Sequence, residues 1–141
     1  MAVIVERTRW LLHPLNGVLL GGTLALFLGA LLSDIAYFRS YEIQWNNFSS
    51  WLLAGGLIVS ACAFVAAIVE SFRNRWRAWP VLAYALLVLA TWILGLIDEL
   101  VHAKDAWATM PASLVLSVIV VVLTCAALWI ALAGMRTGDV P

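Results

Sequence analysis

The sequence predicts an all-α membrane protein, a bundle of four transmembrane helices, and two observations predict it. First, 65% of the 141 residues are hydrophobic, 11% are charged, and the mean hydropathy is +1.01. A soluble domain of this length needs more polar surface, so lipid must surround most of the chain. Second, the sequence contains four long apolar runs, at about 14–38, 51–72, 80–101 and 111–133. We expect residues 1–141 to form a single four-helix domain.

Each run is long enough to span a bilayer, because about 20 helical residues cross ~30 Å of hydrocarbon. Lipid offers no hydrogen bonds to the backbone, so a spanning segment must be a helix or a strand of a closed barrel. Barrel strands alternate polar and apolar residues, whereas these runs do not. The four runs are therefore predicted to be helices.

The first run begins with His13-Pro14, and Pro14 suits the first turn of a helix, where its missing N–H costs nothing. His13 is then expected at or near the N-cap. Further along, small residues recur at every fourth position and predict a face for close helix packing. These residues are Gly17, Gly21, Ala25, Gly29 and Ser33.

The four runs suggest two copies of one helical hairpin. Runs one and two form the first copy, and runs three and four form the second. In each hairpin an acid lies near the end of the first helix (Asp34, Asp98), and a tryptophan is expected in the loop that follows (Trp45, Trp107). In run two, Gly55-Gly56, Ser60, Ala63 and Ala67 predict a similar but less regular face of small residues.

The basic residues predict that both termini face the cytoplasm. Six lie before run one, between runs two and three, or after run four, and two lie in the other connections. The six are Arg7, Arg9, Arg73, Arg75, Arg77 and Arg136; the two are Arg39 and Lys104. The formal net charge of +0 argues against a nucleic-acid partner.

Two histidines are the natural residues to test as redox-cofactor ligands. His13 lies at the cytoplasmic start of run one and His102 at the outer end of run three, so one haem iron cannot bind both. A b-type haem or a quinone on one of them stays open, but no cofactor is predicted outright. The sequence shows no metal site and no nucleophile–base pair, so we predict no catalytic residue and no enzyme.

The segment "DELVHAKDAWATMP", residues 98–111, gathers charge where the membrane meets outer water. On a continuing helix, Asp98, Glu99 and His102 would share a face, because they lie three or four residues apart. Asp34 could meet Asp98 or His102 if the hairpins pack side by side. The segment, with Asp105 and Trp107, is either a solvated helix end or a docking surface for a periplasmic partner.

Four motifs together resemble the bacterial four-helix membrane proteins called domain of unknown function 2231. They are "HP" at the entry to run one, "SD" at its exit, the Gly-Gly pair of run two, and "VHAKDAW…MP…LVLS" leading into run four. The resemblance implies a small inner-membrane subunit that serves an electron-transfer assembly. It directs attention to His13, Pro14, Asp34, His102, Asp105 and Trp107.

Three functions follow as hypotheses. The first is a non-catalytic membrane subunit that anchors or assembles a redox complex and contacts lipids, a periplasmic redox protein or other membrane subunits. The second is an electron-transfer subunit that binds a b-type haem or reacts with quinone at His13 or His102. The third, a small transporter, is the weakest, because charges lie at span ends rather than at the midplane, where transport sites usually lie.

Overall fold

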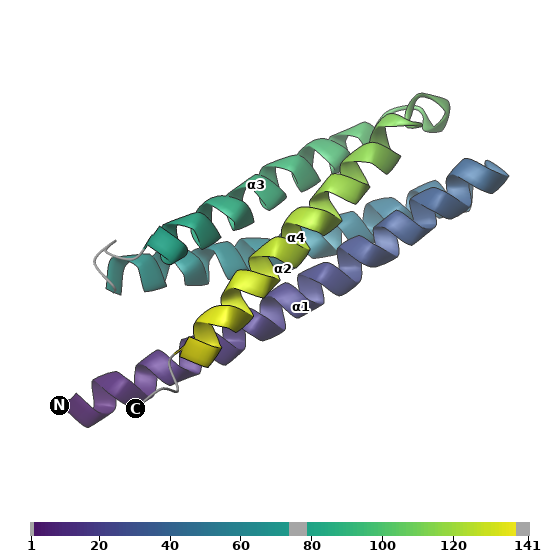
Figure 1. Ribbon diagram of the computed structural model, residues 1–141. Coiled ribbons are helices and arrows are strands. Elements are labelled where there is room, and N and C mark those ends of the chain that lie inside the picture. Colours follow the sequence, from purple (N-terminus) through teal and green to yellow (C-terminus); the bar gives the residue numbers. More distant parts are fainter. Residues whose placement is uncertain (1, 74–78, 138–141) are drawn as a thin grey trace.

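The computed structural model describes residues 2–73 and 79–137, and the side chains of 14–69, 72 and 82–133. The described chain forms α1 (Ala2–Ser40), α2 (Ile43–Arg73), α3 (Trp79–His102), the short 3-10 helix η1 (Ala106–Ala108) and α4 (Ala112–Thr137), as Figure 1 shows. Each of the four α-helices contains a stretch long and apolar enough to cross a membrane, at 14–40, 43–69, 82–102 and 112–133. The prediction of four membrane helices is confirmed.

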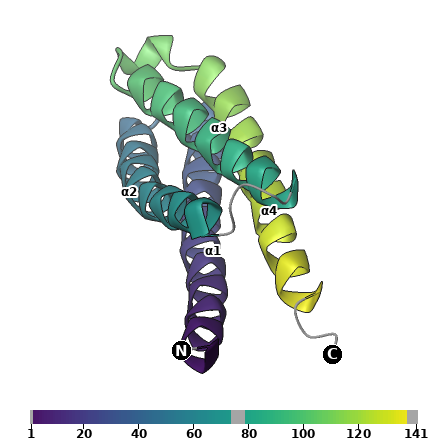
Figure 2. The same cartoon turned by 90° about the vertical axis from the view of Figure 1, so that its left-hand side faces the viewer.

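The four helices run up and down, and α4 closes the bundle by packing against α1 as well as α3 (Figures 1 and 2). The start of α1 and the end of α4 lie at one end of the bundle. We call the other end, which carries the α1–α2 turn and the 103–111 connection, the loop end. Asp34 and His102, far apart in sequence, are both close to the loop end for this reason.

The buried face of every helix follows a seven-residue repeat, in which spacings of three and four residues alternate. This repeat keeps one seam of each helix toward its neighbours and is typical of left-handed four-helix bundles. The buried positions on this repeat are 16, 20, 23, 27, 30, 34 and 37 in α1; 46, 49, 53, 56, 60, 63 and 67 in α2; 84, 88, 91, 95, 98 and 102 in α3; and 113, 117, 120, 124 and 127 in α4. Ser33, Leu57 and Val101 are buried next to it.

The predicted small-residue face of α1 does not coincide with this seam. Ser33 is buried and a Cβ at Gly29 would lie 3.1 Å from Leu52, but Ala25 is exposed. A Cβ at Gly21 would meet nothing within 4 Å. Residues spaced by four turn 40° further around a helix of 3.6 residues per turn at each step, so they drift away from a seam that repeats every 3.5 residues.

The second helix begins earlier than the sequence indicates, at Ile43 rather than near position 51. The polar residues at 44–50 predicted a loop, but they lie on the helix, and Trp45 with them. Asn46 and Ser49 occupy buried positions there, and the Ser49 hydroxyl donates to the Ala30 carbonyl oxygen over 3.1 Å. A two-residue turn replaces the expected loop: Tyr41 has a positive φ of 54°, and its N–H donates to the Tyr37 carbonyl oxygen over 2.7 Å.

The first helix also begins earlier than expected, at Ala2, so Pro14 lies inside it. The expectation that Pro14 occupies the first turn and His13 the N-cap is wrong. A helix satisfies its backbone internally and can therefore extend beyond the apolar segment into water, with one hydrogen bond lost at the proline.

Candidate functional site

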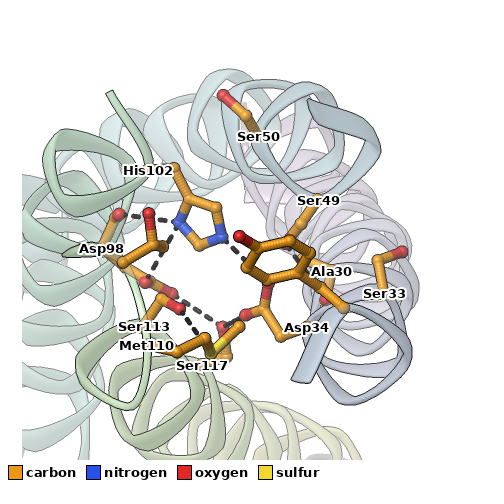
Figure 3. A network of polar contacts seen from close by, with 12 residues as sticks. Ala30, Ser33, Asp34, Ser49, Ser50, Asp98, His102, Met110, Ser113 and Ser117 are labelled. Atoms are coloured by element: carbon orange, nitrogen blue, oxygen red, sulfur yellow. Dashed lines mark hydrogen bonds and ion pairs between the residues drawn. The ribbon is translucent and has the colours of Figure 1, made fainter. Parts of the chain in front are cut away.

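Four polar side chains from three helices meet at the loop end and form what we call the polar layer: Asp34 of α1, Asp98 and His102 of α3, and Ser117 of α4 (Figure 3). His102 Nε2 lies 2.9 Å from Asp34 Oδ1. Ser117 Oγ contacts Asp34 Oδ2 and lies 2.8 Å from Asp98 Oδ2. The expectation that Asp34 meets His102 is confirmed, and Ser117 links Asp34 to Asp98.

The polar layer is enclosed by protein. Asp34 and Asp98 are 0% exposed, Ser117 is 1% exposed and His102 is 5% exposed. Charged groups in such surroundings are stable only when they are paired and hydrogen-bonded. The layer therefore fixes α1, α3 and α4 in one relative position, because each group depends on partners from the other helices.

The local sequence explains how α3 presents its two members of the layer. Asp98 and His102 lie one helical turn apart, and His102 Nδ1 donates to the Asp98 carbonyl oxygen over 3.0 Å. The same nitrogen lies 3.4 Å from Asp98 Oδ1. The ring is thus oriented from within its own helix, and Nε2 is directed across the bundle toward α1 (Figure 3).

Hydrogen bonds around the polar layer fasten the loop to the helices. The Tyr37 hydroxyl donates to the Ala106 carbonyl oxygen over 3.0 Å, which ties α1 to η1. The Ser113 hydroxyl lies 3.4 Å from the Met110 sulfur, where the loop enters α4. These contacts hold the 103–111 connection against the bundle.

The other predicted residues of the "DELVHAKDAW" segment lie outside the polar layer. Glu99 faces α2, where its Oε1 accepts a hydrogen bond from Ser50 over 2.7 Å. Asp105 is exposed and precedes η1 without a side-chain capping bond. Trp107 is 77% exposed, and its ring stacks on Tyr41 with centroids 5.8 Å apart. The segment therefore divides into a buried part, an α2 contact and a surface part.

A pocket of about 560 Å³ lies beside the polar layer, between the start of α2 and the loop. His102 forms part of its wall, while the side chains of His102, Asp34 and Asp98 have no exposed surface. The Oδ1 atom of Asn46, a residue only 7% exposed, has no hydrogen-bond partner among the described residues. The lining residues are Ile43, Gln44, Asn46, Asn47, Ser50, His102, Lys104 and Ala106.

The two histidines differ in what they offer a haem. Both ring nitrogens of His102 are engaged, by Asp98 and Asp34, so neither is free to bind iron in this arrangement. The side chain of His13 lies outside the described residues, although its backbone belongs to α1. No group of three His, Cys, Asp or Glu side chains in the described part of the chain is arranged to hold a metal ion.

Sequence reasoning missed Ser117 and Tyr37. Ser117 is the last residue of the "LVLS" stretch, and a hydroxyl in an apolar helix is easily taken for a neutral small residue. The signal that could have found it is the seven-residue repeat, which places 117 on the same seam as the polar residues 113 and 124. Tyr37 follows Asp34 on the seam of α1 in the same way.

The comparison with protein families gives one match, and it covers most of the chain. A family model described as "Predicted membrane protein (DUF2231)" matches residues 12–136. Neither a curated protein nor a solved structure matches the chain. The matched range includes every described helix crossing and all four residues of the polar layer. The chain, a multi-pass membrane protein, therefore belongs to the family of predicted membrane proteins defined by domain of unknown function 2231.

Proposed function

We propose that the protein is a non-catalytic inner-membrane subunit that docks a partner protein at its loop end and so anchors or assembles a larger complex. The observation that carries the proposal is the stacked pair of Tyr41 and Trp107, which is exposed although the loop beneath it is held in place. Tyr41 is 53% exposed and Trp107 is 77% exposed. Exposed aromatic side chains on a fixed scaffold are typical of the residues that contribute most to protein interfaces.

Two features support docking at this end. The pair joins the α1–α2 turn to the 103–111 connection, and the Tyr37–Ala106 hydrogen bond supports the same junction from below. A surface that is already ordered loses less conformational entropy when it binds. The surroundings also carry charges of both signs, with Arg39, Glu42, Lys104 and Asp105 exposed, as expected of the polar rim of an interface.

The partner that we propose is a periplasmic redox protein. The excess of basic residues in the sequence before the first span, between the second and third, and after the fourth supports a periplasmic position for the loop end. The redox character rests on the family resemblance alone. The engaged nitrogens of His102 make the alternative, a haem ligated by this histidine, the weaker proposal, since the polar layer would have to open first.

Site-directed photocrosslinking in native membranes tests the proposal. A photoreactive phenylalanine analogue at position 107 should form an adduct with a protein partner. The same analogue at position 129 should give lipid adducts only, because Trp129 is 74% exposed but lies within a membrane span. An absorption spectrum of the captured partner should show a haem, flavin or iron–sulfur centre.

Two outcomes would contradict the proposal at different levels. Lipid adducts alone at position 107 would show that the aromatic pair is only an interfacial anchor in the membrane. A captured partner without a redox centre would keep the docking role and remove the redox assignment.

A further inference from the structure

The hydrogen atoms in the polar layer can be counted from its contacts. His102 Nδ1 faces the Asp98 carbonyl oxygen, which can only accept, so Nδ1 carries a hydrogen. His102 Nε2 lies 2.9 Å from Asp34 Oδ1, and this contact needs a second hydrogen, held by either atom. The histidine and Asp34 together then have no net charge, either as an imidazolium with a carboxylate or as a neutral imidazole with a carboxylic acid.

The contacts of Ser117 require one more hydrogen atom in the polar layer. Its single oxygen contacts carboxyl oxygens of both Asp34 and Asp98, but a hydroxyl has only one hydrogen to donate. If both carboxyl groups were ionised, one contact would bring two oxygen lone pairs together without a hydrogen between them. Both contacts are satisfied when one carboxyl group is protonated and donates to Ser117, which donates to the other.

The charge balance leads to the same result. With this additional hydrogen the layer is neutral as a whole; without it, the layer carries one net negative charge among side chains that are almost fully buried. The described groups that face the layer offer no compensation: Ser49 and Ser50 of α2 are neutral, and Glu99 of α3 is an acid bonded to Ser50. Arg39 and Lys104 are exposed, and no ion pair joins either to Asp34 or Asp98 among the described side chains.

One unpartnered acceptor lies on the wall of the pocket beside the polar layer. It is Asn46 Oδ1; Asp98 Oδ1 is also fully buried and makes no hydrogen bond within the described structure, but His102 Nδ1 lies 3.4 Å from it. A pocket of about 560 Å³ has room for water, and water is a donor that the Asn46 oxygen on its wall lacks. His102 belongs both to the polar layer and to the lining of this pocket.

We propose that the polar layer is a proton-binding site, in which Asp34 and Asp98 share one exchangeable proton through Ser117 and exchange it with water in the pocket beside His102. In release, the O–H bond of the carboxylic acid breaks, water takes the proton, and the layer changes from neutral to one negative charge. Uptake reverses these steps, and no other reactant is required. The site is independent of the docking surface, since neither Tyr41 nor Trp107 takes part in it.

Infrared spectroscopy of the purified protein in lipid vesicles tests the proposal. A protonated carboxyl group has a carbonyl stretching band separate from the amide and carboxylate bands. We expect this band at neutral pH, a shift of the band in heavy water, and its loss on alkalinisation while the protein stays folded. The absence of the band at neutral pH in the folded protein would overturn the proposal.

Asparagine variants locate the proton. In Asp98→Asn the amide supplies its own hydrogen to Ser117, so the variant should fold and elute normally but lose the band; Asp34→Asn should also lose it. The controls are Asp105→Asn, at an exposed position, and Glu99→Gln, which removes the neighbouring half-buried acid. Loss of the band in Glu99→Gln, with retention in both layer variants, would place the proton elsewhere and overturn the proposal.

Discussion

The polar layer and the apolar core of the bundle occupy the same kind of position and differ in chemistry. Asp34, Asp98 and Ser117 continue the seven-residue seams that elsewhere carry Leu20, Val88 and Val120. The apolar core is held by contact area and shape, which many combinations of residues satisfy. The polar layer is held by directed hydrogen bonds, and each of its groups needs a particular partner. The same packing geometry thus supports an apolar core that tolerates many residue combinations and a polar layer that requires particular residues.

The middle of the bundle shows how closely the apolar core is fitted. Phe27 is 1% exposed and lies between α2 and α3, where Gly56 and Gly95 leave space for its ring. A Cβ at Gly56 would lie 2.4 Å from Phe27 Cε1, and one at Gly95 would lie 3.4 Å from Phe27 Cζ. These two glycines, rather than those spaced by four in α1, permit close packing at this level.

The largest effect on stability is expected from breaking the polar layer with Asp34→Ala. The change leaves His102 Nε2 buried without its partner and removes one of the two carboxyl contacts of Ser117, and losing one member of a buried ion pair costs about 3–5 kcal/mol. Unfolding in mixed micelles should show this loss. Glu42→Ala, at an exposed position of the same end, is the control and should unfold like the parent protein. Equal stability of the two variants would contradict the structural role of the layer.

The next effect is expected in the apolar core, from Gly56→Ala. The added methyl group overlaps the Phe27 ring, which has little free space, and overpacking of this kind costs about 1–3 kcal/mol. The matched control is Gly21→Ala, where nothing lies within 4 Å of the new Cβ. The double variant Phe27→Leu with Gly56→Ala should recover part of the loss. If the two glycine variants unfold alike, the tight fit around Phe27 is not a source of stability.

A smaller effect is expected from Tyr37→Phe, which tests whether the loop depends on the bundle. The variant removes the hydrogen bond to the Ala106 carbonyl oxygen and should cost about 1 kcal/mol. Amide hydrogen exchange should become faster in residues 103–109 and stay unchanged in the middle of the helices. Uniform acceleration along the chain would show that Tyr37 stabilises the whole bundle rather than the loop.

The smallest effect on stability is expected from Trp107→Ala, which removes an exposed side chain and should change the free energy of unfolding by at most about 0.5 kcal/mol. The same variant should lower the yield of the proposed partner in co-purification from native membranes. Trp129→Ala, equally exposed but within a span, should leave the yield unchanged. Retention of the partner by Trp107→Ala would remove the aromatic pair from the docking surface.

Part of the site was visible in the sequence because it depends on helix spacing and on the number of crossings. Asp98 and His102 lie one turn apart, and four crossings bring the end of α1 and the end of α3 to the same side. With the further condition that the hairpins pack side by side, these two facts allowed Asp34 to meet Asp98 or His102. Ser117 did not follow, because its importance depends on which face of α4 turns toward α1 and α3.

The same distinction explains the errors. The start of α2 was placed too late because asparagine and serine are typical of loops, yet Asn46 and Ser49 are buried against other helices. The glycine spacing in α1 predicted a packing face that the seven-residue seam does not follow. In both cases the neighbouring helices determined the role of the residue. The local composition of a segment does not show which helices it packs against.

The sequence by itself determined the solvent, the number of helices and the relative direction of the chain at each crossing, because these depend on total apolar length and on the hydrogen-bonding needs of a backbone in lipid. Only the tertiary structure decided which polar groups meet, which glycines face an aromatic ring and where a pocket opens. Those outcomes depend on the rotation of each helix about its own axis, which is set by contacts among all four helices at once.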